Sequence, residues 1–99
     1  VSMGKRNNRQ ELQDRITLLA GKAGVSVEEL TGCGRIYELS SLRKAVYAIL
    51  YLDGYKVSEI ADCFNRTHPT VVIGIDRIMG LNEIGDRATH EMFVKLLTD

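Results

Sequence analysis

Hydrophobic residues recur every three or four positions in several separate stretches of the chain, which is the spacing of amphipathic helices. No alternating apolar and polar run bounded by hairpin turns indicates a sheet. The widest apolar stripe predicts a helix that follows a cap at Ser40 or Ser41 and ends near Gly54. Its apolar positions are Leu42, Ala45, Val46, Ile49 and Leu50. We therefore expect an all-α domain with this helix at the centre of its core.

Two shorter helices are expected before it. The first begins after Asn8, which with Glu11 resembles a capping box, and Gly24 stops it. Ser26 and Glu29 form a better capping box and predict a short helix over 27–31. The inward residues of the first helix are expected to be Leu12, Ile16, Leu19 and Ala23.

Three more helices are expected after it, giving a compact bundle of about six. Apolar spacing predicts a short helix over 57–64, and a turn at Asn65 and Arg66 follows it. Thr67 is a good cap for a fifth helix over 68–79 that ends near Gly80. The expected buried stripe of the fifth helix consists of Val71, Ile75, Ile78 and Met79. Asp86 can cap the last helix, whose expected inward residues are Ala88, Met92, Phe93, Leu96 and Leu97.

Length and charge limit what the protein does. A chain of 99 residues has room for a polar, basic tail over 1–9 and one domain over 10–99. It is too short to contain an ATPase domain as well. Thirteen Lys and Arg balance thirteen Asp and Glu, so no whole-molecule field attracts nucleic acid or membrane. Any such binding must depend on a local basic patch.

The sequence predicts no catalysis and no metal or other cofactor. Cys33 and Cys63 form no CxxC pair and have no histidine at a metal-ligand spacing, which favours a reduced, cytoplasmic setting. The chain contains no Walker-type loop, HExxH or GxSxG motif, so we expect no enzyme and no small-molecule substrate. Its longest apolar stretch, 45–50, is too short to span a membrane.

The two helices over 57–79 have the order of a helix-turn-helix, which many DNA-binding proteins use. Thr70, Ile73, Gly74 and Arg77 share the outward face of the second helix. Polar groups in its first turn can bond to base edges, while the helix dipole favours a phosphate. Gly74 allows either close approach of DNA or contact with a neighbouring helix, and the sequence leaves both open.

Four stretches resemble a known family in order and spacing over about 16–78. They are Gly24-Val25-Ser26-Val27-Glu28-Glu29-Leu30 with Gly32 after it, Leu42-Arg43-Lys44-Ala45-Val46-Tyr47-Ala48-Ile49-Leu50, Val57-Ser58-Glu59-Ile60-Ala61-Asp62-Cys63-Phe64 and Asn65-Arg66-Thr67-His68-Pro69-Thr70-Val71. The chain resembles the C-terminal duplex-binding domain of the bacterial replication initiator DnaA, whose fold is similar to that of Trp repressor. Thr67 stands where the family has an aspartate, and Asp76 stands where a basic residue is common.

The resemblance implies roles for named residues. His68 and Thr70 would lie at the major groove and Arg66 at a phosphate or base, while Arg35 would reach the minor groove. Arg43 would contact DNA from the long helix, and Lys44 would contact a phosphate. The full expected DNA-binding set is Arg35, Arg43, Lys44, Arg66, Thr67, His68, Thr70 and Arg77. The expected basic patch adds Lys56 and extends to the tail residues Lys5, Arg6 and Arg9.

These residues predict binding to double-stranded DNA, with helix 68–79 in the major groove and an accessory role in replication or in a mobile element. The alternative is a helical protein-interaction module that kept the fold but lost DNA binding. For single residues, the rival interpretations are a simple surface cation at Arg43 and a capping or partly buried histidine at His68. The target sequence and the oligomeric state stay open.

Overall fold

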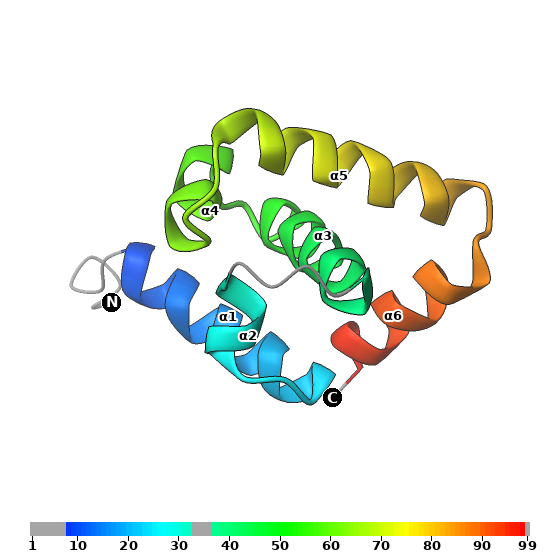
Figure 1. Ribbon diagram of the computed structural model, residues 1–99, viewed down its shortest axis with the longest axis horizontal. Helices are drawn as coiled ribbons and strands as arrows, with labels where there is room; N and C mark the ends of the chain where they lie inside the picture. The colour runs from blue at the N-terminus through cyan, green and yellow to red at the C-terminus, as the bar shows by residue number, and fades with distance from the viewer. Residues whose placement is uncertain (1–7, 33–36, 99) are drawn as a thin grey trace.

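Six α-helices and no strand make up residues 8–32 and 37–98, the part of the chain that the computed structural model describes (Figure 1). The radius of gyration is 13.2 Å, close to the roughly 13 Å expected of a compact chain of this length. The all-α class and the compact shape are therefore confirmed. The helices are α1 (Asn8–Ala23), α2 (Val27–Thr31), α3 (Tyr37–Leu52), α4 (Val57–Cys63), α5 (His68–Glu83) and α6 (Arg87–Leu97).

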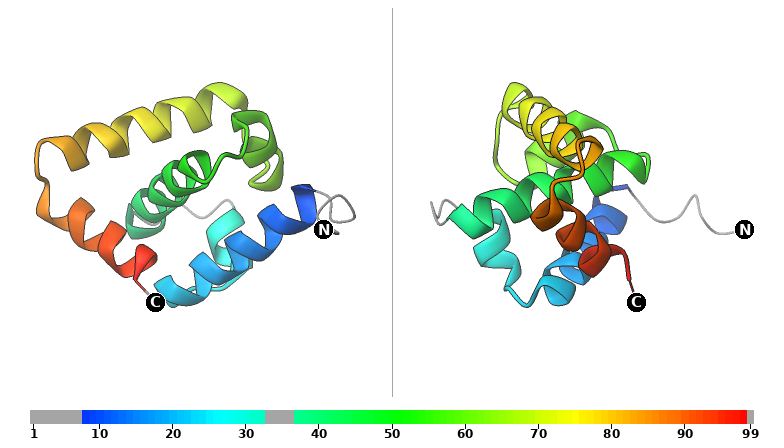
Figure 2. Two further views of the ribbon diagram at one scale, coloured as in Figure 1. Left: turned by 180° about the vertical axis from the view of Figure 1, so that it is seen from behind. Right: turned by 90° about the vertical axis from the view of Figure 1, so that its right-hand side faces the viewer.

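Helix α3 occupies the centre of the domain and contacts the other five helices (Figures 1 and 2). Every residue over 45–50 is buried, so the middle of α3 is covered on all sides rather than along one stripe. A helix that is apolar all round its surface is expected to be buried in this way. The prediction that this helix forms the centre of the core is confirmed.

Two helix ends differ from the sequence prediction. Helix α3 begins at Tyr37, so Ser40 and Ser41 lie inside it rather than capping it. Leu39 is buried in the core, and this tertiary packing outweighs the local preference of serine for a cap. Helix α5 continues past Gly80 to Glu83, and the chain turns at Gly85, whose φ is +80°. A glycine inside a helix weakens it but does not by itself end it, whereas a glycine in the left-handed conformation is a common helix terminator.

Several other predicted starts and stops agree with the structure, but the start of the first helix does not. Ser26 and Glu29 make the reciprocal bonds of a capping box, and Asp86 accepts a hydrogen bond from the Thr89 backbone N–H. Gly24 turns the chain after α1 with a φ of +78°. Helix α1 already includes Asn8, so the expected end of the tail at residue 9 falls inside this helix.

Helix α6 buries a narrower stripe than predicted. Phe93 and Leu96 are buried, but Ala88 is exposed and Leu97 is 57% exposed, so the inward placement of these two was wrong. The buried residue near the start is Thr89, whose side-chain and backbone hydrogen bonds lower the pKa of Asp86. Only one side of α6 meets the rest of the domain, and the opposite side stays in solvent.

Helices α4 and α5 are joined by a short turn, and α5 then lies across α3 (Figure 2). Val71, Ile75 and Ile78 are buried on the inner side of α5 as predicted. The outer side leaves Pro69, Thr70, Ile73, Asp76 and Arg77 exposed. This packing fixes one face of α5 and presents the other to solvent.

Candidate functional site

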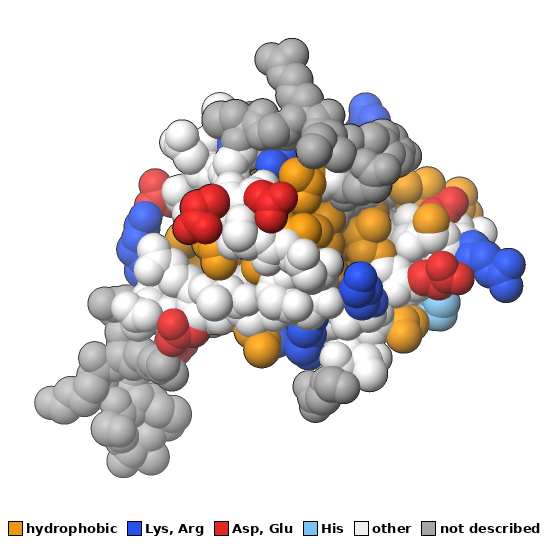
Figure 3. Space-filling view, turned by 60° about the horizontal axis from the view of Figure 1, so that its bottom comes forward, with side chains coloured by type: hydrophobic (Ala, Val, Ile, Leu, Met, Phe, Trp, Pro, Cys, Tyr) orange, Lys and Arg blue, Asp and Glu red, His pale blue; other side chains and the backbone are white. Residues whose placement is uncertain are grey.

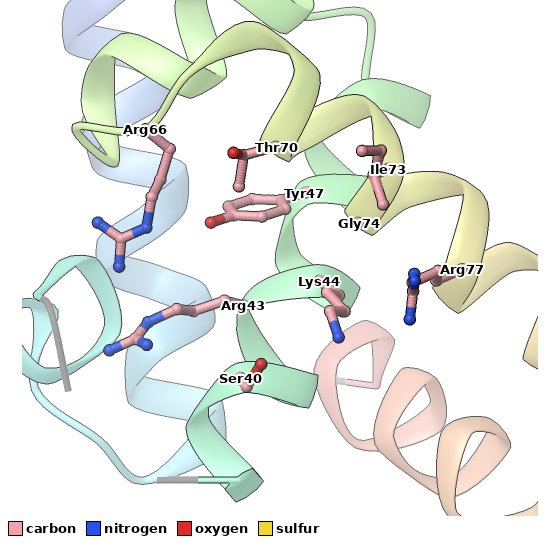
Figure 4. A pocket seen from close by; sticks show the side chains of 9 residues that line it. All are labelled: Ser40, Arg43, Lys44, Tyr47, Arg66, Thr70, Ile73, Gly74 and Arg77. Atoms are coloured by element: carbon pink, nitrogen blue, oxygen red, sulfur yellow. The ribbon is translucent and has the colours of Figure 1, made fainter. Parts of the chain in front are cut away.

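A groove of about 350 Å³ lies between α3 and α5 (Figure 4). Helix α3 contributes Ser40, Arg43, Lys44 and Tyr47; α5 contributes Thr70, Ile73, Gly74 and Arg77; and the turn before α5 contributes Arg66. Four of these described residues are Lys or Arg, and none is Asp or Glu. The groove is therefore positively charged although the whole chain is neutral.

The groove collects five of the eight residues expected to bind DNA. They are Arg43, Lys44, Arg66, Thr70 and Arg77. Thr67 and His68 are exposed at the start of α5, next to Thr70 in the chain. Arg35 lies outside the described residues. The fold thus brings together side chains from two helices and a turn that the sequence separates.

Lys44 and Arg77 reach the same end of the groove from different helices, with Arg43 and Arg66 toward the other end (Figure 4). Within the part of the chain that the structure describes, neither Lys44 nor Arg77 forms an ion pair within 4.0 Å. Asp76 lines a second hollow with both cations, outside ion-pair distance. Two neighbouring positive charges without a paired acid repel each other, and an anion between them would relieve that repulsion.

Arg43 is not the simple surface cation of the rival interpretation. Its side chain is 6% exposed, and its Nε and Nη2 atoms donate to the carbonyl oxygens of Leu30 and Glu29, each at 2.7 Å. Carbonyls in the last turn of a helix lack intrahelical partners, so these bonds satisfy groups at the end of α2. Arg43 thereby tethers α2 to α3. Its contact with DNA stays a prediction.

Arg66 also bonds to the backbone beyond α2. Its Nη2 atom donates to the carbonyl oxygen of Gly32 at 2.6 Å, and its Nη1 atom donates to the carbonyl oxygen of Phe64 at 3.1 Å. The side chain is half-buried and lines the groove at the same time. Arg66 therefore connects the turn before α5 to the end of α2, a role that the sequence did not indicate.

The first turn of α5 presents polar groups to solvent. Thr67 caps the helix, with its Oγ1 atom 3.4 Å from the Thr70 backbone nitrogen that donates to it. The hydroxyl oxygens of Thr67 and Thr70 are 2.7 Å apart. His68 is exposed, so the interpretation as a partly buried histidine was wrong. Its role at DNA stays a prediction.

Gly74 lies where α5 contacts α3. A Cβ atom at this position would stand 3.1 Å from Cδ2 of Tyr47 and 3.3 Å from Cγ of Lys44, closer than side chains ordinarily pack. Of the two roles left open for Gly74, contact with a neighbouring helix is confirmed.

Tyr47 forms the floor of this contact. It is 3% exposed, and its ring meets that of Phe64 edge to face with the centroids 4.9 Å apart. Burial raises the pKa of Tyr47 above its ordinary value, while Arg66 and Arg43 oppose that rise. Packing therefore accounts for the burial of Tyr47, and the sequence did not indicate that this residue lines the groove.

Two other cations of the expected patch do not line the groove. Arg9 pairs with Asp62 of α4, so its charge is matched by an acid. Lys56 precedes α4 and is exposed, and it is not among the lining residues. Lys5 and Arg6 lie outside the described residues. The cationic groove is thus smaller than the patch expected from the sequence.

The described residues contain neither a group of three or more potential metal ligands nor a helix long and apolar enough to cross a membrane. No protein-family model matches this chain, and no curated protein matches it either. The resemblance to the DnaA duplex-binding domain therefore depends on the four sequence stretches within 24–71, and the groove geometry is independent of it.

Proposed function

We propose that the protein binds double-stranded DNA as a helix-turn-helix domain similar to that of DnaA and Trp repressor. Helix α5 would enter the major groove with its first turn at the base edges, and α4 would lie toward the backbone. The observation that carries the proposal is the groove between α3 and α5, which gathers four cations without a carboxylate beside the exposed start of α5.

The charge distribution supports this orientation. Phosphate contacts supply most of the affinity of a duplex-binding protein, so a neutral chain needs its cations gathered on the docking side. Figure 3 shows the molecule with the bottom of Figure 1 turned toward the viewer. On this face, acidic and basic side chains are interspersed. Glu28, Glu29 and Glu91 are exposed on α2 and α6, away from the lining of the groove.

A salt titration tests the proposal. A fluorescent duplex is titrated with the protein at several salt concentrations, and the logarithm of affinity should fall linearly with the logarithm of salt. Lys44→Ala and Arg77→Ala should each weaken all duplexes alike and reduce the slope by about 1. Lys95→Ala on α6 is the matched control and should leave the slope unchanged. No binding even at low salt would overturn the proposal and favour the protein-interaction module.

Selection from random duplexes tests which residues read bases. His68→Ala and Thr70→Ala should mainly reduce the preference between selected and unselected duplexes, because base contacts specify and phosphate contacts position. A uniform loss of affinity for all duplexes would show that neither side chain reads a base.

A further inference from the structure

Ile73 is a large aliphatic side chain placed among cations. It is 53% exposed and lines the groove that contains Lys44 and Arg77 (Figure 4). Thr70 precedes it by three positions and Arg77 follows it by four, so the three side chains share one face of α5. A half-exposed isoleucine adds little to the core, and on this face of α5 its side chain is accessible to a partner outside the chain.

We propose that Ile73 contacts the C5-methyl group of a thymine in the major groove and makes duplex binding depend on that methyl. The inference rests on the proposed function. Thymine alone among the four bases presents an apolar group at its major-groove edge. At any other base, the isoleucine side chain would cover hydrogen-bond donors or acceptors of the base without bonding to them. The base would lose its hydrogen bonds to water there, and this loss disfavours binding.

The fold holds this side chain at a fixed place. Val71 and Ile75, on either side of Ile73 in the chain, are buried, and Gly74 lies against Tyr47. Helix α5 therefore cannot rotate to hide Ile73 without exposing part of its buried stripe. A side chain that contacts a base is held in position more precisely on a packed helix than on a loop.

Uracil replacement isolates the methyl group. A tightly bound duplex is first selected from a random pool, and each of its thymines is then replaced singly by deoxyuridine, which lacks only that methyl. At one position the wild-type protein should lose about fourfold in affinity, the factor expected for one buried methyl group. Ile73→Ala should bind the thymine and uracil duplexes equally, and Ile73→Val should keep part of the difference.

Leu81→Ala is the matched control, because Leu81 is also an exposed aliphatic residue of α5 but does not line the groove. It should keep the wild-type ratio between thymine and uracil duplexes. Indifference of the wild-type protein to every uracil replacement would overturn the inference, and so would a ratio that Ile73→Ala leaves unchanged. If no duplex binds at all, the proposed function has failed, and the inference fails with it.

Discussion

The Nε atom of Arg43 donates a hydrogen bond of 2.7 Å to the carbonyl oxygen of Leu30, which joins the central helix α3 to the end of the short helix α2. Helix α2 is only five residues long, and a helix of that length is not stable without tertiary contacts. Buried Arg43 and half-buried Arg66 supply such contacts at its carbonyl end. Arg43 and Arg66, which are both predicted to contact DNA, therefore also stabilise the fold.

Replacing Arg43 should lower the free energy of unfolding. Arg43→Ala leaves the carbonyls of Leu30 and Glu29 without these donors, and such losses cost about 2–4 kcal/mol together. Arg43→Lys should recover only part, because an ammonium group does not have the fork of a guanidinium. Lys44 is the half-buried neighbour of Arg43 in the chain, and Lys44→Ala serves as the control. Its free energy of unfolding should stay within about 0.5 kcal/mol of the wild-type value. Urea denaturation measures all three; equal stability of Arg43→Ala and wild type would contradict the assigned role.

Two glycines of α5 should respond in opposite directions to alanine. At Gly80 nothing lies within 4 Å of an added Cβ atom, so Gly80→Ala should stabilise the protein by about 0.5–1 kcal/mol through helix propensity. At Gly74 an added Cβ atom would stand 3.1 Å from Cδ2 of Tyr47, a buried side chain whose ring also packs edge to face against Phe64. Overpacking there costs about 1–3 kcal/mol, so Gly74→Ala should be destabilising overall.

Thermal unfolding of both glycine variants, followed by circular dichroism, measures the difference. Gly80→Ala serves as the control for propensity, because it makes the same chemical change on the same helix. Stabilisation by Gly74→Ala as large as that by Gly80→Ala would show that the contact with α3 tolerates a methyl group.

Local signals predicted the helices, but the groove depends on contacts between distant segments. The capping box at Ser26 and the caps at Thr67 and Asp86 are formed within three residues, so the sequence alone could show them. The start of α3 was missed because burial of Leu39 outweighs the serine cap. The burial of Arg43 depends on carbonyls that lie 13 and 14 positions away, and no spacing rule indicates such a partner.

Thr67 should be replaceable by aspartate without loss of stability. Asp caps a helix at least as well as Thr and is favoured by the helix dipole, whereas Thr67→Ala should cost about 1 kcal/mol. In DNA binding, Thr67→Asp should weaken all duplexes at low salt, because it adds a negative charge beside the first turn of α5. Paired denaturation and DNA titrations separate the two effects. A loss of stability in Thr67→Asp equal to that in Thr67→Ala would contradict the capping role.

Asp76 should oppose duplex binding. It is exposed on α5 and lines a hollow with Lys44 and Arg77, so a phosphate held by those cations would also meet its carboxylate. Two charges about 10 Å apart in water interact by about 0.4 kcal/mol, which corresponds to about twofold in affinity. Asp76→Asn should therefore tighten binding at least twofold at low salt, and the gain should shrink as salt screens the repulsion.

Glu83→Gln controls for the change in net charge, because Glu83 is exposed at the far end of the same helix and lines neither hollow. The same fluorescent duplex titrated at several salt concentrations measures both variants. Equal gains would mean that only the net charge matters. Weaker binding of Asp76→Asn would mean that the Asp76 carboxylate itself accepts a hydrogen bond from a base, as carboxylates do from the amino group of cytosine. A selective gain at Asp76 would place the DNA phosphates at the end of the groove where Lys44 and Arg77 meet.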